Sequence, residues 1–495
     1  MNKYILAIDQ GTTGSRCFIF NSKAEVVSSS YQEFPQYFPK PGWVEHDANQ
    51  IWASVESVIK KAIASAKIDP KNILGIGITN QRETTILWDR KTQKPLAKAI
   101  VWQDRRTAPL CKKLKKYESL VRGITGLVVD PYFSATKIAW LLDHVKGLRS
   151  KAQKGQVAFG TTDSWLIFKL TGGQSHSTDM TNASRTLLYD IVLKEWSPKL
   201  LKLFRIPKEI LPKVSFSGGV FGHTANVAGL PAGVPIVAVM GDQQAALYGQ
   251  GCFSAGTIKN TYGTGCFMVL NTGHKRKVSE GGLLTTLACD IDGKPLYALE
   301  GSVFIAGAVI QWLRDQLKVI PDALASERVI SGLKDNAGVY FVPAFVGLGA
   351  PYWNAQARGM ITGLTRGASI EHIVRAALEA IAYQTKDVFD LMQKESGLRI
   401  KSLAVDGGAC RNNFLMQFQA DILSTVIVRP CMVDSTVAGV ASLAGIKAGL
   451  WKGKNLAKMR KVDKSFKPKM TAKKVQECYR GWQKAVGQAT FLAKD

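Results

Sequence analysis

The chain has 495 residues, of which 46% are hydrophobic and 21% charged, and its formal net charge is +27. This length and apolar content exclude a disordered chain and are sufficient for two or more domains with separate cores. The basic clusters at residues 112–116 and 452–474 contain a single aromatic residue, Phe466, and no recognisable nucleic-acid module, so a solvated basic surface is favoured; weak binding to nucleic acid or a membrane is the alternative.

The first apolar run, residues 4–8, is too short for a secretory signal, and no later window approaches the ~18 apolar residues of a membrane helix. We therefore expect a cytoplasmic protein without a membrane span. The eight cysteines contain no C-x-x-C pair and the six histidines form no ligand-spaced cluster. This pattern predicts neither a disulfide framework nor structural zinc.

The opening of the chain predicts a hairpin of two apolar strands, residues 4–8 and 17–20, around the polar stretch 9–16. Two glycines allow a tight turn, while hydroxyl, backbone N–H and arginine donors at the turn suit phosphate oxygens. Asp9, at the end of the first strand, can face a divalent cation. An ordinary polar hairpin is the alternative interpretation.

Three further segments of the first half place polar or aromatic side chains after apolar runs. Arg82 and Glu83 follow the predicted strand 73–79 and can bind the hydroxyls of a small polyol, or form a plain ion pair. Trp102 ends a short strand and is either core or an apolar wall beside a substrate. Tyr132 precedes a predicted helix and is a candidate hydroxyl donor.

Asp242 follows the purely apolar strand 235–240 and precedes a predicted helix. An acid at the exit of a buried strand is well placed to act as a general base. The alternative is that Asp242 only caps the helix.

After residue 250 the sequence repeats the strand–turn–strand pattern of the opening hairpin. It predicts strand 257–261, a Gly-Thr-Gly turn at 263–265 and strand 266–270. This architectural repeat predicts two α/β domains, residues 1–250 and 251–495, each with a phosphate-type hairpin. Later, Gly408 and Asn412 follow strand 402–405, where backbone can approach an adenine ring closely.

Long stretches of the sequence resemble one family. They include AIDQGTTGSR, KPGWVEHD, GITNQRETT, AIVWQDRRT, DPYFSATKIAWLLDH, TNASRTLLYD, GDQQAALYGQ, KNTYGTGCFM, VPAFVGLGAPYW and DGGACRNNFLMQFQADIL. The chain resembles the FGGY carbohydrate kinases, within the actin, hexokinase and Hsp70 superfamily, and NQRETT and WQDRRT resemble its glycerol-phosphorylating members rather than the xylulose and gluconate kinases.

The resemblance implies two RNase H-like (actin-like ATPase) α/β domains with an interdomain catalytic cleft. It also implies ATP and Mg²⁺ as cofactors, and transfer of a phosphoryl group to glycerol to form sn-glycerol 3-phosphate. A homo-oligomer, dimer or tetramer, is expected, with no specific nucleic-acid partner. Another sugar or polyol kinase of the family, or a non-catalytic basic binding protein on the same fold, remains an alternative function.

The resemblance also implies roles for individual residues. The glycerol hydroxyls would be held by Arg82, Glu83, Tyr132, Asp242 and Gln243, with Trp102 and Phe267 as apolar walls. Asp242 would be the general base, and Asp9 and Asp242 would serve the metal. The nucleotide would be bound by Thr12, Thr13, Gly14, Arg16, Thr264, Gly307, Gln311, Gly408 and Asn412.

Two departures from the family pattern stand out. Gly14 occupies a position where many relatives carry serine, so one hydroxyl donor to phosphate is missing. Residues 227–235 contain no arginine, whereas relatives inhibited by fructose 1,6-bisphosphate carry a Gly/Arg loop there. We therefore expect no inhibition by that sugar phosphate.

Overall fold

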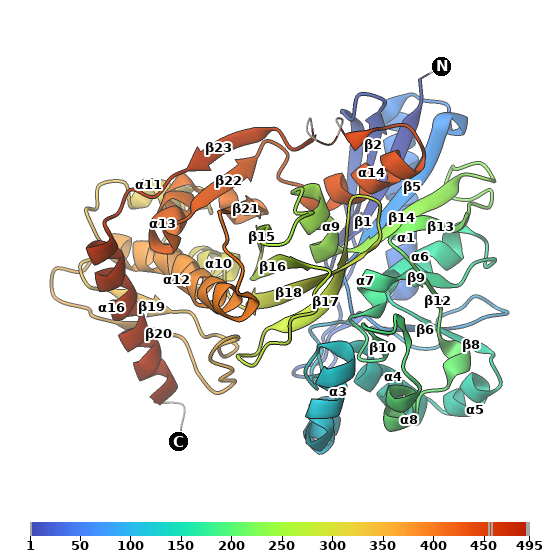
Figure 1. Cartoon of the computed structure of the whole chain (residues 1–495), viewed down its shortest axis with the longest axis horizontal. Coiled ribbons are helices and arrows are strands. Elements are labelled where there is room, and N and C mark those ends of the chain that lie inside the picture. Colours follow the sequence, from blue (N-terminus) through green and yellow to red (C-terminus); the bar gives the residue numbers. More distant parts are fainter. Residues whose placement is uncertain (1, 454–455, 457–458, 492–495) are drawn as a thin grey trace. The chain divides into compact units, whose positions relative to one another are not determined.

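A computed structural model describes residues 2–453, 456 and 459–491. The chain forms two compact units, the first built from residues 1–253, 285–297 and 436–460 and the second from 254–284, 298–435 and 461–495. Each unit contains its own central sheet with helices packed on it (Figure 1). Residues 454–455 and 457–458, within the basic segment 452–474, lie outside the described part of the chain.

The first unit is built on a six-stranded sheet with the order β13-β14-β5-β1-β2-β3. The strands β1, β2 and β3 form an antiparallel meander, and β5 and β14 run parallel to β1. The bounds are Tyr4–Gln10 (β1), Gly14–Asn21 (β2), Val26–Glu33 (β3), Ile73–Asn80 (β5), Gly218–His223 (β13) and Pro235–Gly241 (β14).

Alternating side chains of β1 cover both faces of this sheet. Leu6 and Ile8 share a buried core with Ile51 and Val55 of α1 (Ala48–Ala66). The segment that returns after residue 435 also packs in this unit, since Trp451 Nε1 donates to the carbonyl of Asn21 at 3.1 Å. Much of that segment is α14 (Ser435–Lys447).

Helices and short strands join these elements. The helices are α2 (Ala108–Leu114), α3 (Glu118–Thr125), α4 (Ser134–His144), α5 (Leu148–Gln153), α6 (Thr162–Leu170), α7 (Met180–Ala183), α8 (Pro198–Phe204) and α9 (Asp242–Gly249). The short strands are β4 (Glu45–His46), β6 (Ile86–Asp89), β7 (Ala99–Ile100), β8 (Val157–Gly160), β9 (Ser177–Asp179), β10 (Tyr189–Asp190), β11 (Glu195–Trp196) and β12 (Lys213–Ser215).

A seven-stranded sheet with the order β17-β18-β16-β15-β21-β22-β23 repeats the arrangement. Most of it lies in the second unit, whereas β17 and the start of β18 fall within residues 285–297, which are counted with the first unit. The hairpin β15–β16 is antiparallel and β21 pairs parallel to β15, as β5 pairs with β1. The hairpin forms where the sequence predicts strand, turn and strand; the parallel strand beside it was not part of that prediction. The bounds are Ile258–Tyr262 (β15), Cys266–Gly273 (β16), Leu284–Cys289 (β17), Pro295–Val303 (β18), Ser402–Asp406 (β21), Val426–Pro430 (β22) and Val462–Phe466 (β23).

The core of the second unit is organised around α12 (Ile370–Ser396). This helix is 27 residues long, begins at a capping box of Ser369 and His372, and ends at Gly397 with a positive φ of 67°. Its buried stripe includes Val374 and Ile381. The other elements are α10 (Gly307–Asp315), α11 (Ala325–Val329), α13 (Asn413–Leu423), α16 (Ala472–Phe491), β19 (Tyr340–Val342) and β20 (Met360–Thr362).

Candidate active site

The turn between β1 and β2 forms the first predicted phosphate hairpin. The N–H of Gly11 donates to the carbonyl of Gly14 at 2.9 Å, which closes the turn, and Thr13 is exposed at its tip. Asp9 and Arg16 are cross-strand partners in the hairpin register, so their side chains share one face of the sheet. The hairpin therefore presents hydroxyl, backbone and guanidinium donors with an acid beside them.

The absence of a side chain at Gly14 leaves room for Tyr31, its neighbour on β3. A Cβ atom at position 14 would lie 2.5 Å from Cε2 and 2.7 Å from the hydroxyl of Tyr31, too close for any side chain. The guanidinium of Arg16 lies over the same Tyr31 ring, 5.4 Å from its centre. A serine at position 14 would therefore require Tyr31 to move.

Arg82 and Asp242 meet at one edge of the first sheet. Arg82 follows β5 and Asp242 follows β14, and these neighbouring strands are parallel, so their carboxyl ends coincide. Arg82 Nε lies 3.1 Å from Asp242 Oδ1, and Arg82 Nη1 donates to Gln244 Oε1 at 3.2 Å. The arginine is buried, whereas the carboxylate of Asp242 is 30% exposed and accessible to a substrate.

Gly241 leaves the space that Arg82 fills. A Cβ atom at position 241 would lie 2.7 Å from Cδ and 2.8 Å from Cγ of Arg82, in the middle of a buried side chain. We expect Gly241→Ala to displace the guanidinium from Asp242 and to lower kcat/KM for the acceptor by about tenfold or more. Steady-state kinetics with Gly219→Ala as the control tests this, because a Cβ at 219 meets only a backbone oxygen at 3.7 Å. Equal kinetics for the two variants would contradict it.

Glu83 is held in a constrained position beside Arg82. Its φ is 61°, in the left-handed region that is uncommon for residues other than glycine, and its side chain is only 1% exposed. Its Oε1 accepts from Arg185 Nε at 2.7 Å, and its carbonyl accepts from Ser134 Oγ at 2.9 Å. Contacts from α4 and from the residues after α7 therefore hold the buried carboxylate of Glu83 in one orientation.

Trp102 and Tyr132 form an aromatic wall in the same unit. The strand β7 ends at Ile100, so Trp102 lies in the following turn and not in the strand as expected. Its Nε1 donates to Thr12 Oγ1 at 3.0 Å, and its ring meets that of Tyr132 edge to face at 5.6 Å. Trp102 therefore connects the phosphate hairpin with the predicted polyol residues.

In the second unit, the turn at residues 263–265 is braced by the start of α10. The N–H groups of Ala306 and Ala308 donate to the carbonyl of Thr264 at 2.9 and 3.1 Å. Gly307 and Gln311 belong to this helix, and Phe267 lies on β16. Asn412 caps α13 by accepting from the N–H of Leu415 at 2.8 Å, just after Gly408.

Comparison with known proteins matches residues 4–249 to the N-terminal domain and residues 258–448 to the C-terminal domain of the FGGY family of carbohydrate kinases. The chain belongs to the FGGY family. A glycerol kinase from Alkaliphilus metalliredigens is 54% identical to it over 492 residues, which cover 99% of this chain and 98% of that protein.

Solved structures of FGGY kinases share this architecture. A Plasmodium falciparum glycerol kinase with ADP has a TM-score of 0.92 at 37% identity, covering 99% of this chain and 98% of that one. A Lactobacillus acidophilus gluconate kinase has a TM-score of 0.89 at 23% identity, covering 100% and 99%, which is a likeness of fold alone. The predicted two-domain α/β fold of the actin-like ATPase type is confirmed.

Three residues that contact the predicted site residues were not identified from the sequence. Gln244 contacts Arg82, and Arg185 contacts Glu83. The Lys137 ammonium is buried and donates to the carbonyl of Tyr132 at 2.5 Å, and burial lowers its pKa to about 8. The sequence marks Lys137 only as the single charged residue in the first turn of α4, just before the apolar residues Ile138 and Ala139.

A buried polar network lies behind the start of α9. Thr181 Oγ1 accepts from the N–H of Gly241 at 2.9 Å and donates to Asp179 Oδ2 at 2.7 Å. Ser217 Oγ donates to the same carboxylate oxygen at 2.7 Å, and burial raises the pKa of Asp179. The network fixes the backbone that carries Asp242.

Asp163 is a second buried acid next to this network. It accepts from the hydroxyls of Thr161 and Thr178, while burial and then the charge of Asp179 raise its pKa to about 7. Because the native state then binds a proton that the unfolded state has lost, stability falls as the pH rises from about 4 to about 7.

Asp163→Asn removes this ionisation. The free energy of unfolding is measured with urea for both proteins. From about pH 5 to about pH 8, we expect the free energy of unfolding of the variant to rise by about 1 kcal/mol or more relative to that of the wild type. Asp47→Asn is the control, because hydrogen bonds lower the pKa of Asp47 and it stays ionised over this interval. The prediction would be contradicted if the difference in free energy of unfolding between the wild type and the variant were the same at about pH 5 and at about pH 8.

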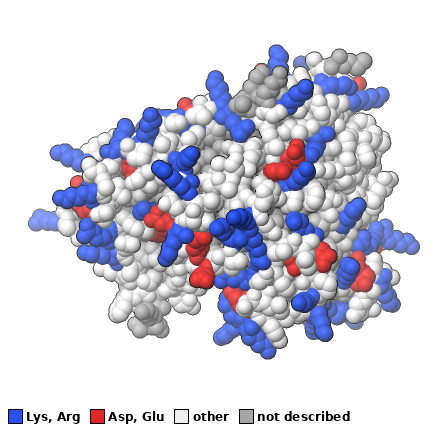
Figure 2. Space-filling model, in the orientation of Figure 1, with Lys and Arg blue, Asp and Glu red and all other residues white. Residues whose placement is uncertain are grey.

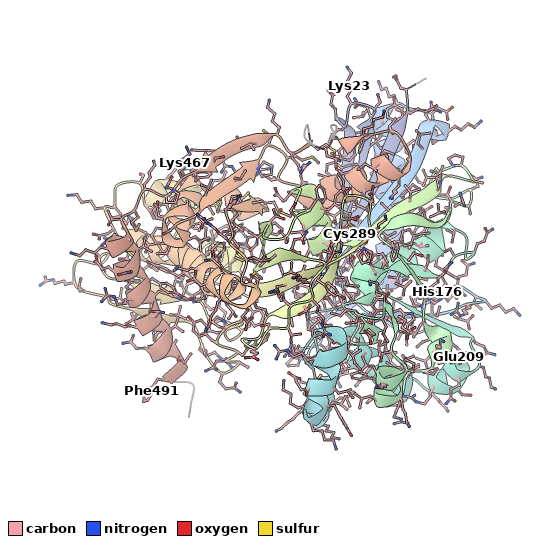
Figure 3. The ribbon with its side chains drawn as sticks, viewed as in Figure 1. Lys23, His176, Glu209, Cys289, Lys467 and Phe491 are labelled. Atoms are coloured by element: carbon pink, nitrogen blue, oxygen red, sulfur yellow. The ribbon has the colours of Figure 1, made fainter. Side chains whose placement is uncertain are left out.

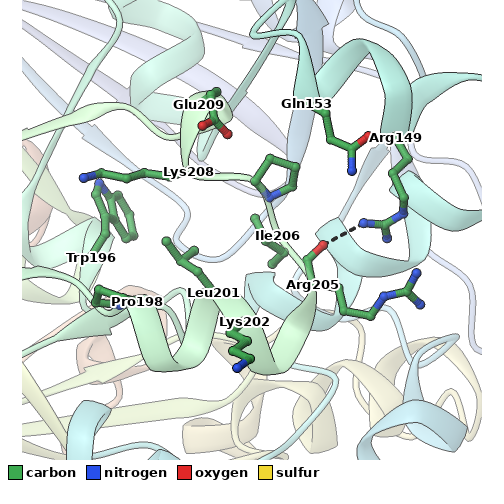
Figure 4. A pocket seen from close by; sticks show the side chains of 11 residues that line it. Arg149, Gln153, Trp196, Pro198, Leu201, Lys202, Arg205, Ile206, Lys208 and Glu209 are labelled. Atoms are coloured by element: carbon green, nitrogen blue, oxygen red, sulfur yellow. Dashed lines mark hydrogen bonds between the residues drawn. The ribbon is translucent and has the colours of Figure 1, made fainter.

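One surface groove lies away from these residues. It has a volume of about 690 Å³ and is lined by α5, α8 and the following loop, including Arg149, Trp196, Lys202 and Arg205 (Figure 4). Its cations point in different directions, and Arg149 donates to the carbonyl of Arg205 at 2.7 Å. It contains none of the predicted site residues.

The basic charge is spread over the surface. On the face shown in Figure 2, Lys and Arg side chains are scattered over both units and mixed with fewer acids. Lys23 and Lys467 lie at the outside, while Cys289 lies among packed side chains, 3.5 Å from Met240 Sδ (Figure 3). Among the helices described, none is long and apolar enough to cross a membrane.

Proposed function

We propose that this FGGY kinase phosphorylates glycerol with ATP, forming sn-glycerol 3-phosphate and ADP, with Asp242 as the general base. The observation that carries the proposal is the arrangement of Arg82, Glu83 and Asp242 at the ends of β5 and β14, with Arg82 Nε 3.1 Å from Asp242 Oδ1. The 54% identity to a curated glycerol kinase over nearly the whole chain supports the choice of substrate.

The first unit holds the acceptor. Arg82 donates to glycerol hydroxyls and Glu83 accepts from them, so neighbouring hydroxyls are bound by groups of opposite polarity. Tyr132 and Gln243 supply further hydrogen bonds. The ring of Trp102 covers the carbon side of the polyol, and Phe267 on β16 is proposed as a further apolar wall.

Transfer needs no covalent enzyme intermediate. Asp242 accepts the proton of a primary hydroxyl as its oxygen forms a bond to the γ-phosphorus of ATP. The bond from that phosphorus to the bridging oxygen breaks, and ADP leaves with the electron pair. Arg82 holds the base and the hydroxyl in one geometry, which lowers the entropic part of the barrier.

Donors for the nucleotide come from both repeats of the fold. In the first unit these are Thr12, Thr13, Gly14 and Arg16, and in the second they are Thr264, Gly307, Gln311, Gly408 and Asn412. The first set suits phosphate oxygens, because hydroxyls, backbone N–H groups and a guanidinium converge on one tight turn.

A magnesium site fits this donor set without a protein cage. The described residues contain no cluster of three or more His, Cys, Asp or Glu side chains that could hold a metal ion. Mg²⁺ usually keeps several waters and takes one or two carboxylates plus substrate phosphates. Asp9 and Asp242 would hold it, and the ion would offset charge on the phosphate oxygens.

We further propose where the enzyme acts and how it assembles. We place the enzyme in the cytoplasm as a homo-oligomer, a dimer or tetramer, without a specific nucleic-acid partner. Size-exclusion chromatography with light scattering measures the assembly.

A coupled assay of ADP release with a panel of acceptors tests the function. Glycerol should support turnover far above xylulose, gluconate and erythritol. A stronger response to another polyol would favour a different FGGY kinase. Salt-sensitive binding to nucleic acid without turnover would favour a basic binding protein.

Fructose 1,6-bisphosphate should not inhibit. The loop between β13 and β14 bends back on itself, with reciprocal backbone hydrogen bonds between Val227 and Leu230, and offers no arginine between residues 227 and 235. Turnover measured with millimolar fructose 1,6-bisphosphate should equal turnover without it. Strong inhibition would contradict this prediction.

A further inference from the structure

Arg185 touches two of the side chains proposed to hold glycerol. It is fully buried, and its Nε donates to Glu83 Oε1 at 2.7 Å. Its guanidinium carbon lies 5.6 Å from the ring centre of Tyr132 and 5.3 Å from that of Phe133. One cation thus contacts both an acceptor and a donor of the glycerol site.

Glu83 depends on this cation more than on its neighbour in sequence. Arg82 Nε is 4.0 Å from Glu83 Oε1 but only 3.1 Å from Asp242 Oδ1. A carboxylate that is 1% exposed requires a compensating charge with good geometry. Arg82 and Asp242 therefore form one pair, and Arg185 and Glu83 form the other.

Tyr132 is fixed from several directions. Trp102 meets its ring in an edge-to-face contact, Arg185 lies over it, and Lys137 Nζ donates to its carbonyl at 2.5 Å. A planar guanidinium can donate along its edge while its face lies against a ring, which an ammonium cannot do. Arg185 consequently holds Glu83 and Tyr132 in a fixed relation to each other.

We propose that Arg185 is a positioning residue that decides which primary hydroxyl of glycerol faces Asp242. This inference rests on the proposed function. The two primary hydroxyls of glycerol are mirror-related, so a site distinguishes them only if its contacts are fixed relative to one another. If Glu83 and Tyr132 shift, glycerol can bind reversed and yield sn-glycerol 1-phosphate.

Arg185→Lys tests the proposal, and Arg106→Lys is the matched control. The side chain of Arg106 is 2% exposed, pairs with Asp104 and Glu45 at 2.8 Å, and lies over the Trp43 ring, but contacts none of the proposed glycerol residues. Product is measured as total ADP released and as the fraction oxidised by a dehydrogenase specific for sn-glycerol 3-phosphate. Nucleotide affinity is measured separately by calorimetry.

We expect Arg185→Lys to raise KM for glycerol by about tenfold to a hundredfold, because a buried charge-assisted hydrogen bond is lost. A fraction of its product should resist the dehydrogenase, while nucleotide affinity stays at the wild-type value. Arg106→Lys should change neither glycerol KM nor the product. A wholly oxidised product, or a glycerol KM equal to that of the control, would overturn the proposal.

A second variant covers the case in which Arg185→Lys does not fold. Glu83→Gln removes the charge that Arg185 holds, so it should also yield a mixed product. A single enantiomer from Glu83→Gln would overturn the proposal as well. Failure of the proposed function looks different, because the wild-type enzyme would then release no ADP in response to glycerol.

Discussion

Asp242→Asn is expected to lower glycerol-dependent ADP release by at least about 10²-fold while nucleotide affinity stays near that of the wild type. Asparagine keeps the size of the side chain and an oxygen for Arg82 and for the N–H of Gln243, which now bind Asp242 Oδ1 at 3.1 and 2.7 Å. It cannot accept the proton of the attacking hydroxyl. Steady-state kinetics and calorimetric titration with ADP separate these two properties.

Asp47→Asn is the matched control for a role in helix capping alone. Asp47 starts α1 by accepting from the N–H of Asn49 at 2.8 Å, and it contacts none of the proposed site residues. This variant should keep wild-type turnover. If Asp242→Asn also kept most of its turnover, Asp242 would be only the first residue of α9 and the assignment of the base would be wrong.

Arg82→Met is expected to lower kcat/KM for glycerol by about 10²-fold or more, because hydrogen bonds to charged groups contribute about 1.5–3 kcal/mol each. The substitution removes donors to the substrate and leaves Asp242 and Gln244 without the guanidinium that they now bind at 3.1 and 3.2 Å. Methionine is shorter than arginine but fills a similar volume with a flexible chain, so packing changes less than charge. Kinetics with glycerol and with ATP as the varied substrate measure the effect.

Stability is the confounding variable in this experiment, since breaking a buried ion pair can destabilise a protein by about 3–5 kcal/mol. Arg106→Met breaks a comparable pair with Asp104 in the same unit and is the control. It should lower the melting temperature but spare kcat/KM of the folded fraction. Equal losses of kcat/KM in the two variants would contradict a direct role for Arg82.

Local sequence patterns predicted much of the first unit. The apolar run before Asp9 forms β1, the run before Arg82 forms β5 and the run before Asp242 forms β14. Each polar residue was therefore predicted at the end of a buried strand, where ligands bind in α/β sheets. The turn after Ile100 departed from expectation, because Trp102 bonds to Thr12 and the strand ends before it.

Hydrogen bonds between side chains about a hundred or more residues apart could not be predicted from local sequence patterns. Arg185 is bound to Glu83 across 102 positions, and Arg82 to Gln244 across 162. Polar residues such as these look like surface residues in the sequence, because their burial depends on compensating charges from other elements. The same holds for Gly14, whose neighbour Tyr31 lies on β3.

The sequence by itself predicted the strands that precede Asp9, Arg82 and Asp242, the repeated strand–turn–strand hairpin, and which polar residues stand at strand ends, because these depend on periodicity and turn chemistry within a few residues. Tertiary structure alone decided that β14 lies beside β5, and hence that Asp242 meets Arg82. It also decided that residues 436–460 return to the first unit and that Arg185 supports Glu83. Strand order and charge pairing are set by the packing of distant segments, which no local pattern encodes.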